Sequence, residues 1–185
     1  MSELTFADKP TLVGDRVMLR PVTEDDVDGL IELIHDPEVM RLTGSHPRPV
    51  DDEREFLRQW YATRTDHDDR LDLAIEDRRT GEYVGEVVLK DLDPDNRSCG
   101  FRIALSAARH FGKGYGGEAT RMVLAHAFGL GVHRVGLEVY AFNPRARHVY
   151  ETAGFVHEGT MRDALLWNGA WVDAHVMAAL APDAS

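Results

Sequence analysis

The sequence has little of what a secreted, membrane-spanning or nucleic-acid-binding protein needs. Cys99 is the only cysteine, so no disulfide can form within the chain. No apolar run reaches the ~18 residues of a membrane-spanning helix, and the first residues lack the basic and apolar regions of a signal peptide. The net charge of −11 disfavours contact with nucleic-acid phosphates. We therefore expect a cytoplasmic protein that binds neither membranes nor nucleic acids.

The acidic excess is confined to the first half of the chain. Residues 1–99 hold 25 acidic and 13 basic residues, whereas residues 100–185 hold 7 and 8. The second half could therefore accept an anionic cofactor and the first half a cationic partner, although acidic residues can also serve only to solvate a surface. A length of 185 residues with 43% hydrophobic residues fits one domain. We expect that domain over 1–185, with loose tails at 1–10 and 182–185.

Hydrophobic periodicity and turn signals predict a mixed α/β fold. The expected strands are 16–22, 71–77, 82–90, 97–105, 133–140, 155–165 and 171–180. The expected helices are 23–35, 51–65, 115–130 and 144–153. Asn168-Gly169 is a strong hairpin signal, and the three strands between 71 and 105 should form an antiparallel meander. Pro37, Pro47 and Pro49 are expected to interrupt regular structure between the first two helices.

A glycine-rich turn, Gly112-Lys113-Gly114-Tyr115-Gly116-Gly117, opens the third of these helices. Such a turn gathers backbone N–H groups at the positive end of the helix dipole, and this arrangement suits phosphate oxygens. Glycine also lets phosphate approach the backbone closely because it has no Cβ. The turn therefore predicts a phosphate-binding site, although a glycine-rich loop can also serve only to reverse the chain.

The same residues match the dinucleotide-binding pattern G-x-G-x-x-G, with Glu138 at the spacing of a ribose-binding acid. Three observations weaken that interpretation. Residues 106–111 separate the turn from its strand, the chain has only one strand–helix–strand unit of this kind, and Glu138 lies inside a strand rather than at its end. A nucleotide-triphosphate loop is excluded because no Gly-Lys-Ser/Thr follows at the required spacing.

The segment from Asn143 to Phe155, about 25 residues later, carries the second informative motif. It places Asn143 at a strand end before Pro144, Tyr150 two helical turns later, and Gly154-Phe155 at the helix end. Together with the glycine-rich turn it resembles the acyl-CoA-binding core of the GNAT superfamily of N-acetyltransferases. The likeness is nearest to the RimJ/RimL-type branch, the ribosomal-protein N-terminal acetyltransferases, and extends from Arg16 to Met177.

This resemblance implies the GNAT fold, a central mixed and mostly antiparallel sheet with helices on both faces. It also implies acetyl-CoA as cofactor, no metal, and direct transfer of the acetyl group to a primary amine. The RimJ/RimL-type layout points to a protein N-terminus as acceptor. A small amine (a polyamine, an amino acid or an antibiotic) is the alternative, and a non-catalytic acyl-CoA sensor is a further one. The acceptor and the choice between monomer and homodimer stay open.

The resemblance also implies roles for individual residues. Tyr150 matches the tyrosine that donates a proton to the departing thiolate, and its ordinary pKa of ~10 keeps it protonated at neutral pH. Arg147 or Lys113 is expected to meet the CoA 3′-phosphate, since Ala146 and Thr152 stand where the family often has Ser and Lys. The cofactor-binding residues implied are Ile103, Ala104, Leu105, Phe111, Gly112, Lys113, Gly114, Gly116, Gly117, Asn143, Arg147 and Tyr150. Phe111 departs from the family, which usually has Gln or Arg there.

Two carboxylates are candidates for the base that accepts the amine proton. Glu86 and Glu138 each lie within an apolar strand run, where burial would raise the pKa of the carboxyl and make it a better base. Each could instead face solvent or an arginine, and a water chain could replace a dedicated base.

The acceptor pocket is expected between the two helices 23–35 and 51–65 and the hairpin 165–171. Its acidic residues, which would favour cations, are expected to be Asp25, Asp26, Glu53 and Glu55. Trp167 and Trp171 could form a dimer contact or a substrate lip. The nine histidines show no metal-ligand spacing.

Overall fold

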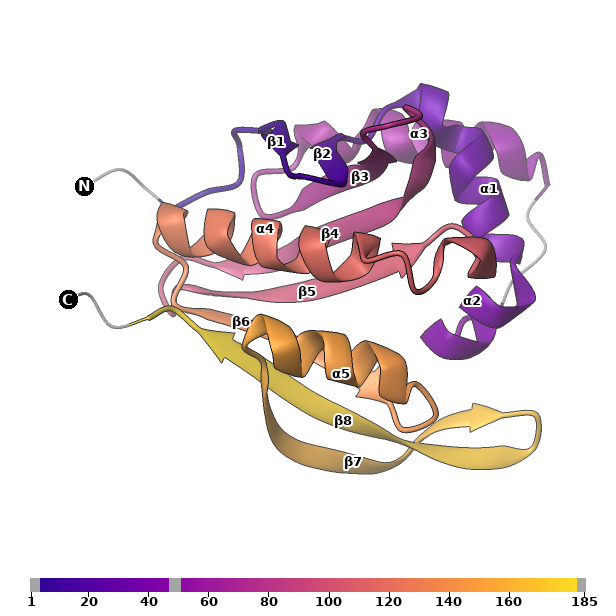
Figure 1. The fold of residues 1–185 in the computed structure, drawn as a ribbon, viewed down its shortest axis with the longest axis vertical. Helices are drawn as coiled ribbons and strands as arrows, with labels where there is room; N and C mark the ends of the chain where they lie inside the picture. The colour runs from indigo at the N-terminus through magenta and orange to yellow at the C-terminus, as the bar shows by residue number, and fades with distance from the viewer. Residues whose placement is uncertain (1–3, 47–50, 183–185) are drawn as a thin grey trace.

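The computed structural model describes residues 4–46 and 51–182, and its centre is an eight-stranded sheet (Figure 1). The strand order is β1-β2-β3-β4-β5-β6-β8-β7. The strands are β1 (Leu12–Val13), β2 (Val17–Pro21), β3 (Leu71–Asp77), β4 (Tyr83–Asp93), β5 (Ser98–Leu105), β6 (Arg134–Tyr140), β7 (Val156–Trp167) and β8 (Ala170–Leu180). All neighbouring pairs are antiparallel except β5 and β6, which are parallel.

Within the described ranges, five α-helices cover the two faces of the sheet. They are α1 (Val27–His35), α2 (Pro37–Thr43), α3 (Glu53–Ala62), α4 (Tyr115–Leu130) and α5 (Pro144–Ala153). Three short 3₁₀ helices accompany them: η1 (Glu24–Asp26), η2 (Arg64–Asp66) and η3 (Ala108–His110). None of the helices in the described ranges is long and apolar enough to cross a membrane. The predicted mixed sheet with helices on both faces is confirmed.

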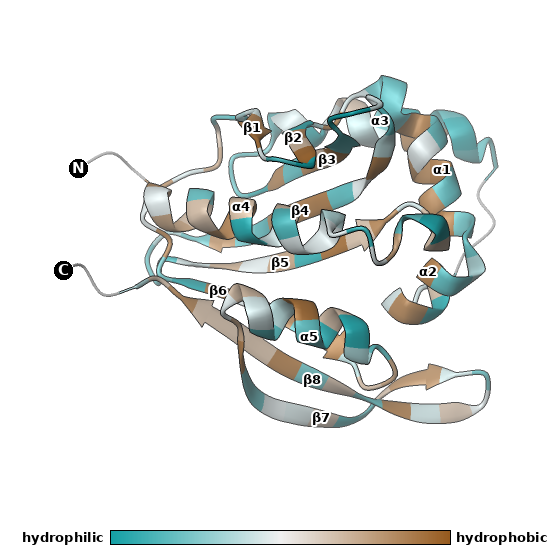
Figure 2. Ribbon diagram, viewed as in Figure 1, coloured by the Kyte–Doolittle hydropathy of each residue, from teal (hydrophilic) through white to brown (hydrophobic). Residues whose placement is uncertain are grey.

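Alternation along the strands divides the core between the two faces. On β3, Leu73 and Ile75 belong to the large cluster that packs under α4, whereas Ala74 packs with Tyr61 of α3 on the opposite face. Figure 2 shows hydrophobic residues concentrated along the central strands β3 and β4. Burial on both faces explains why these strands read as apolar runs in the sequence.

The sheet splits between β5 and β6. Their parallel register covers only Ser98↔Arg134, Cys99↔Val135 and Gly100↔Gly136. Beyond Gly100 the strands separate, so the β5 backbone over residues 103–105 has a strand partner, β4, on one side only. This splay leaves unpaired backbone groups and a gap in the sheet at the position where the cavities described below lie.

Two local predictions are wrong, each for an identifiable reason. The segment after Pro37 forms α2, because Asp36 caps it by accepting from the N–H groups of Glu38 and Val39, and proline at the first helical position begins a helix rather than ending one. Residues 4–10 are not loose: Phe6 is fully buried, and Nζ of Lys9 donates to the carbonyl of Phe6 at 2.6 Å. Pro47, Pro49 and the tail residues 1–3 and 183–185 lie outside the described ranges.

The predicted meander and hairpin are confirmed. β3, β4 and β5 pair antiparallel in chain order. Asn168 and Gly169 join β7 to β8 with φ values of 49° and 80°. Two consecutive positive φ values are what a two-residue type I′ turn requires, which is why Asn-Gly signals it so strongly.

Candidate active site

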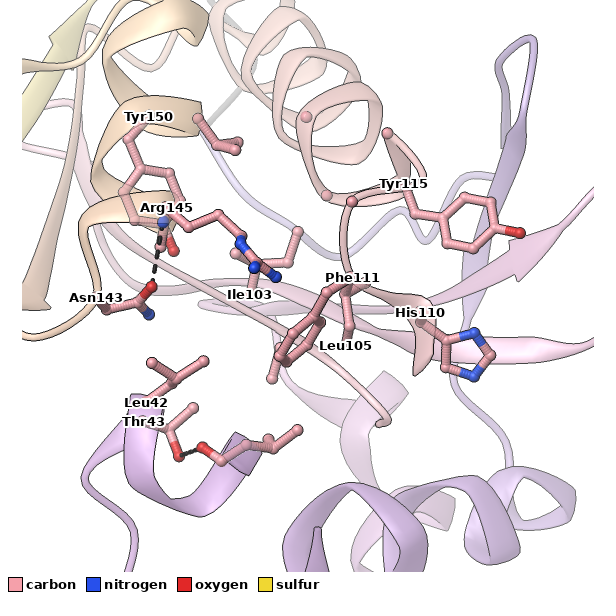
Figure 3. Close-up of a pocket in the computed structure, with 18 residues that line it drawn as sticks. Leu42, Thr43, Ile103, Leu105, His110, Phe111, Tyr115, Asn143, Arg145 and Tyr150 are labelled. Carbon is pink, nitrogen blue, oxygen red and sulfur yellow. Dashed lines mark hydrogen bonds between the residues drawn. The ribbon is translucent and has the colours of Figure 1, made fainter. Parts of the chain in front are cut away.

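A first cavity of about 250 Å³ lies at the glycine-rich turn (Figure 3). It is bounded by the end of β5, the start of α4, the start of α5 and the end of α2. Most of the predicted cofactor residues line it: Ile103, Ala104, Leu105, Phe111, Gly112, Gly114, Gly116, Gly117, Asn143 and Tyr150. Lys113 and Arg147 are not among the lining residues that the structure describes.

The turn is shaped to leave the start of α4 uncovered. Gly112 and Gly114 have φ values of 73° and 85°, which side chains other than glycine rarely adopt. A Cβ added at Gly116 would meet nothing within 4 Å. The N–H groups of the first helical turn have no acceptor within the helix, and the dipole adds positive potential there. These residues fit the pyrophosphate of an acyl-CoA.

Arg145 is a cavity residue that the site prediction missed. Its guanidinium carbon lies 5.5 Å from the centroid of the Phe111 ring, and both residues line the first cavity. Nε of Arg147 instead pairs with Glu151 at 2.9 Å. Helical periodicity could have found this arrangement, since Arg145 and Val149 are four residues apart and share a face, whereas Arg147 lies on another.

Tyr150, which lines the first cavity, is held by aromatic packing. Its ring is 8% exposed and lies edge-on to Phe101 and Phe155, each with ring centroids 5.8 Å away. Burial raises the pKa of the phenol well above its usual value, so it stays protonated and able to donate. Its hydroxyl has no hydrogen-bond partner among the described residues.

Asn143 combines a structural role with a free amide. Its Oδ1 accepts from the N–H of Ala146 at 3.1 Å and so caps α5. The side-chain NH₂ is left without a partner in the described part of the chain, beside Tyr150 in the cavity wall (Figure 3).

A second cavity of about 600 Å³ adjoins the first through the splay. Six residues line both cavities: Leu42, Thr43, Ile103, Ala104, Asn143 and Tyr150. The second cavity also has apolar walls from α1 and α2, including Leu33, Ile34 and Met40, and polar side chains from the strands, among them Lys90, Arg102 and Glu138. Tyr150 therefore lies where two separate binding spaces meet.

Glu86 is buried behind Arg102 in a chain of hydrogen bonds. Nη2 of Arg102 donates to Oε1 of Glu86 at 2.5 Å, and the hydroxyl of Tyr61 donates to Oε2 at 2.5 Å. The hydroxyls of Tyr61 and Tyr83 are 2.8 Å apart. Glu86 is 3% exposed and is not among the cavity-lining residues, whereas the side chain of Arg102 is 48% exposed and lines the second cavity.

Glu138 has the opposite environment. The prediction that burial surrounds it is wrong, because it is exposed on the part of β6 that the splay uncovers. No ion pair or hydrogen bond engages its carboxylate among the described residues. Glu138 therefore faces the second cavity as a free carboxylate, whereas Glu86 is paired and lines neither cavity.

The acidic residues expected around the acceptor do not line the second cavity in the described part of the chain. Oδ1 of Asp26 pairs with Arg20 at 2.8 Å, Glu53 with His35 at 2.8 Å, and Glu55 with Arg58 at 2.8 Å. None of these, nor Asp25 or residues 165–171, is among the lining residues of the second cavity that the structure describes. α2, which the sequence did not reveal, contributes Met40, Leu42 and Thr43 to that lining. The hairpin lies next to the end of α2, where the ring of Trp167 stacks on His46 with centroids 5.0 Å apart.

The profile of the acetyltransferase (GNAT) domain family matches residues 16–156. The chain belongs to the GNAT acetyltransferase family. It is 28% identical over 166 residues to spermidine N(1)-acetyltransferase of Vibrio cholerae, covering 89% of this chain and 93% of that one. It is 26% identical over 176 residues to the uncharacterized N-acetyltransferase YoaA of Bacillus subtilis, covering 94% and 98%.

Solved structures agree with this membership. The crystal structure of spermidine N-acetyltransferase from Vibrio cholerae in complex with CoA and spermine superposes with a TM-score of 0.79 at 28% identity, covering 91% of this chain and 97% of that one. The predictions of the GNAT fold, of an acyltransferase and of acetyl-CoA as cofactor are confirmed. The protein is an acetyl-CoA-dependent N-acetyltransferase of the GNAT type.

Proposed function

We propose that this GNAT protein transfers an acetyl group directly from acetyl-CoA in the first cavity to a small primary amine in the second cavity. The observation that carries the proposal is the junction of the two cavities at Tyr150 and Asn143. A direct transfer needs both reactants held against each other at one point. A cavity closed on the acceptor side would not provide this.

The residues of the first cavity would hold acetyl-CoA, which supplies the activated acetyl group. The amides at the start of α4, from Gly114 to Gly117, suit the pyrophosphate, and Arg145 adds a cation beside them. The one-sided backbone of β5 over residues 103–105 suits the amides of the pantetheine arm, because an extended chain can pair there as a strand would.

Two side chains would then divide the proton chemistry, and a third would position a neighbour. Tyr150 holds its proton and donates it from its hydroxyl toward the leaving sulfur. Glu138, exposed in the second cavity, accepts the proton of the incoming ammonium, directly or through water. Glu86 acts as a positioning residue, because it orients Arg102 and does not itself reach either cavity.

Spermidine N(1)-acetyltransferases of Vibrio cholerae and Escherichia coli are among the relatives, and this supports a small amine over a protein N-terminus as acceptor. Membership of the RimJ/RimL-type branch and acetylation of protein N-termini stay predictions, as do the cytoplasmic location, the single-domain organisation and the oligomeric state.

The test is acceptor-dependent release of CoA thiol, measured with a thiol reagent, and mass spectrometry of the acceptor. The panel holds single amino acids, spermidine, aminoglycosides and short peptides that begin with Ala, Ser or Met. We expect release with a small primary amine and one acetyl group on that amine. Release of CoA with peptides alone would show that the acceptor is a protein N-terminus and not a small amine. Binding of acetyl-CoA without CoA release for any amine would favour the interpretation as a non-catalytic sensor.

A further inference from the structure

Few charged residues line the described part of the second cavity. Of its described lining residues, Lys90 and Arg102 are cationic and Glu138 is the one carboxylate. Nζ of Lys90 pairs with Asp91 at 2.6 Å, and Arg102 pairs with Glu86. Glu138 is therefore the one lining carboxylate without a cationic partner among the described residues, and it can meet one ammonium group rather than several.

Arg102 is built to present its guanidinium to the cavity. Glu86 engages Nη2 alone, so Nη1 and Nε have no partner within the described part of the chain. Tyr61 donates to the second oxygen of Glu86, and burial raises the pKa of that phenol, which therefore remains a donor. Glu86 accepts only one of the two N–H groups of Nη2. The second N–H of Nη2, together with that of Nε or Nη1 on the same edge, can therefore bind a carboxylate in bidentate fashion.

Arg102 and Glu138 occupy matched positions on the two strands that part. Gly100 and Gly136 are the last paired residues of β5 and β6, and each charged residue comes two positions later on its strand. Side chains two residues apart on a strand share a face. A cation and an anion therefore stand on the same face of the sheet, on opposite sides of the splay.

From this geometry we infer that the acceptor is an amino-carboxylate, a small molecule with a primary amine and a carboxylate. This inference rests on the proposed function. Arg102, with Lys90 beside it, binds the carboxylate, and the amine points toward Glu138 and Tyr150. The apolar wall of Leu33, Ile34 and Met40 leaves room for an apolar side chain. Free α-amino acids with aliphatic side chains have this chemistry.

The test compares acceptors that differ in the carboxylate alone. Leucine, leucinamide and 3-methylbutylamine share the aliphatic chain and the primary amine. Because the two amines differ in pKa, each kcat/KM is calculated per concentration of neutral amine. On that basis we expect the value for leucine to be about tenfold or more higher than the value for leucinamide. Equal values for the acid and the amide, or a preference for spermidine, would overturn the inference while leaving acetyl transfer to a primary amine intact.

The variants separate recognition from folding. Arg102→Gln alone would leave Glu86 as an unpaired buried charge, so the informative protein is Glu86→Gln/Arg102→Gln, in which a neutral pair replaces the ion pair. This double variant should lose the tenfold preference for leucine over leucinamide, mainly because the KM for leucine rises. Lys90→Gln should lose part of that preference. Arg134→Gln is the matched control, because Arg134 pairs with Glu158 and does not line the cavity.

A binding measurement supplies a readout that does not need turnover. 4-Methylpentanoate, which has the carboxylate and chain of leucine but no amine, should bind to the protein in the presence of CoA in a calorimetric titration. Binding should be lost in the double variant and kept in Arg134→Gln. Binding that the double variant retains would overturn the role of Arg102. No CoA release for any amine in the panel would instead count against the proposed function.

Discussion

The hydroxyl of Tyr61 donates a 2.5 Å hydrogen bond to Oε2 of Glu86, while Arg102 occupies Oε1 of the same carboxylate. Both oxygens of this buried carboxylate therefore already hold donors from within the protein. A base must also lie within reach of the proton that it accepts, and Glu86 lines neither cavity. We therefore propose that Glu86 supports Arg102 and that Glu138, which lines the second cavity, is the base.

The two glutamates should respond differently to the same substitution. Glu138→Gln should lower kcat roughly 100-fold, the usual worth of a general base, with little change in melting temperature because the side chain is exposed. Glu86→Gln should act mainly on the acceptor KM and on stability, since it weakens a buried network. Steady-state kinetics and thermal melting check both. A fully active Glu138→Gln beside an inactive but folded Glu86→Gln would reverse the assignment.

Tyr150→Phe should retain the fold and the cofactor but lose the proton donor. Phenylalanine keeps the edge-on packing with Phe101 and Phe155, so the melting temperature and the Kd for acetyl-CoA should change little. We expect kcat to fall roughly 100-fold or more.

The raised pKa of Tyr150 also predicts the alkaline behaviour of the wild type. A phenol donates only below its pKa, and burial moves that pKa upward. The rate should therefore rise as the acceptor amine loses its proton and show no decline near the ordinary tyrosine value of ~10. A decline in kcat centred below pH ~10 that is absent in Tyr150→Phe would contradict this environment.

The glycine-rich turn can be tested with two substitutions in one helix. A Cβ at Gly116 or at Gly129 would meet nothing within 4 Å, so both alanine variants should fold. Both should gain about 0.5–1 kcal/mol from helix propensity. Of these two glycines, Gly116 lines the first cavity and Gly129 does not. Gly116→Ala should therefore weaken acetyl-CoA binding by roughly tenfold or more, whereas Gly129→Ala should not. Calorimetry measures both, and equal affinities for the two variants would exclude close approach of phosphate at this turn.

Substitutions of Arg145 and Arg147 form a matched pair that tests which arginine contacts the anionic cofactor. Arg145 lines the first cavity, whereas Arg147 pairs with Glu151 on another face of α5. Arg145→Ala should raise the Kd for acetyl-CoA roughly tenfold, or about 1.4 kcal/mol, and make it less sensitive to salt. Arg147→Ala should change it little. The reverse result would restore the role that the sequence suggested for Arg147.

Much of the fold could be predicted because local signals and tertiary structure agree. The central strands are apolar runs since both faces are covered, and Asn168-Gly169 fixes the hairpin by its backbone conformation. The glycine-rich turn and the segment from Asn143 to Tyr150 could be found because each is a short local pattern, one at the start of α4 and one along α5.

The acceptor side could not be predicted as well, because it depends on contacts between distant segments. α2 was hidden by Pro37, which reads equally as a helix start or a break. The environment of Glu138 depends on where β5 and β6 stop pairing, and no local pattern marks that point. The Glu86–Arg102 pair joins residues 16 positions apart through strand register, which a sequence alone does not give.

The most direct test of the account is a matrix of initial rates, in which acetyl-CoA and the accepted amine are both varied. Two cavities that meet at Tyr150 require both reactants to be bound before the acetyl group moves. Double-reciprocal lines for different acetyl-CoA concentrations should therefore intersect, and intact-mass analysis should find no acetyl group on the protein when the amine is left out. Parallel lines, the fingerprint of a covalent acyl-enzyme, together with an acetylated protein, would contradict direct transfer.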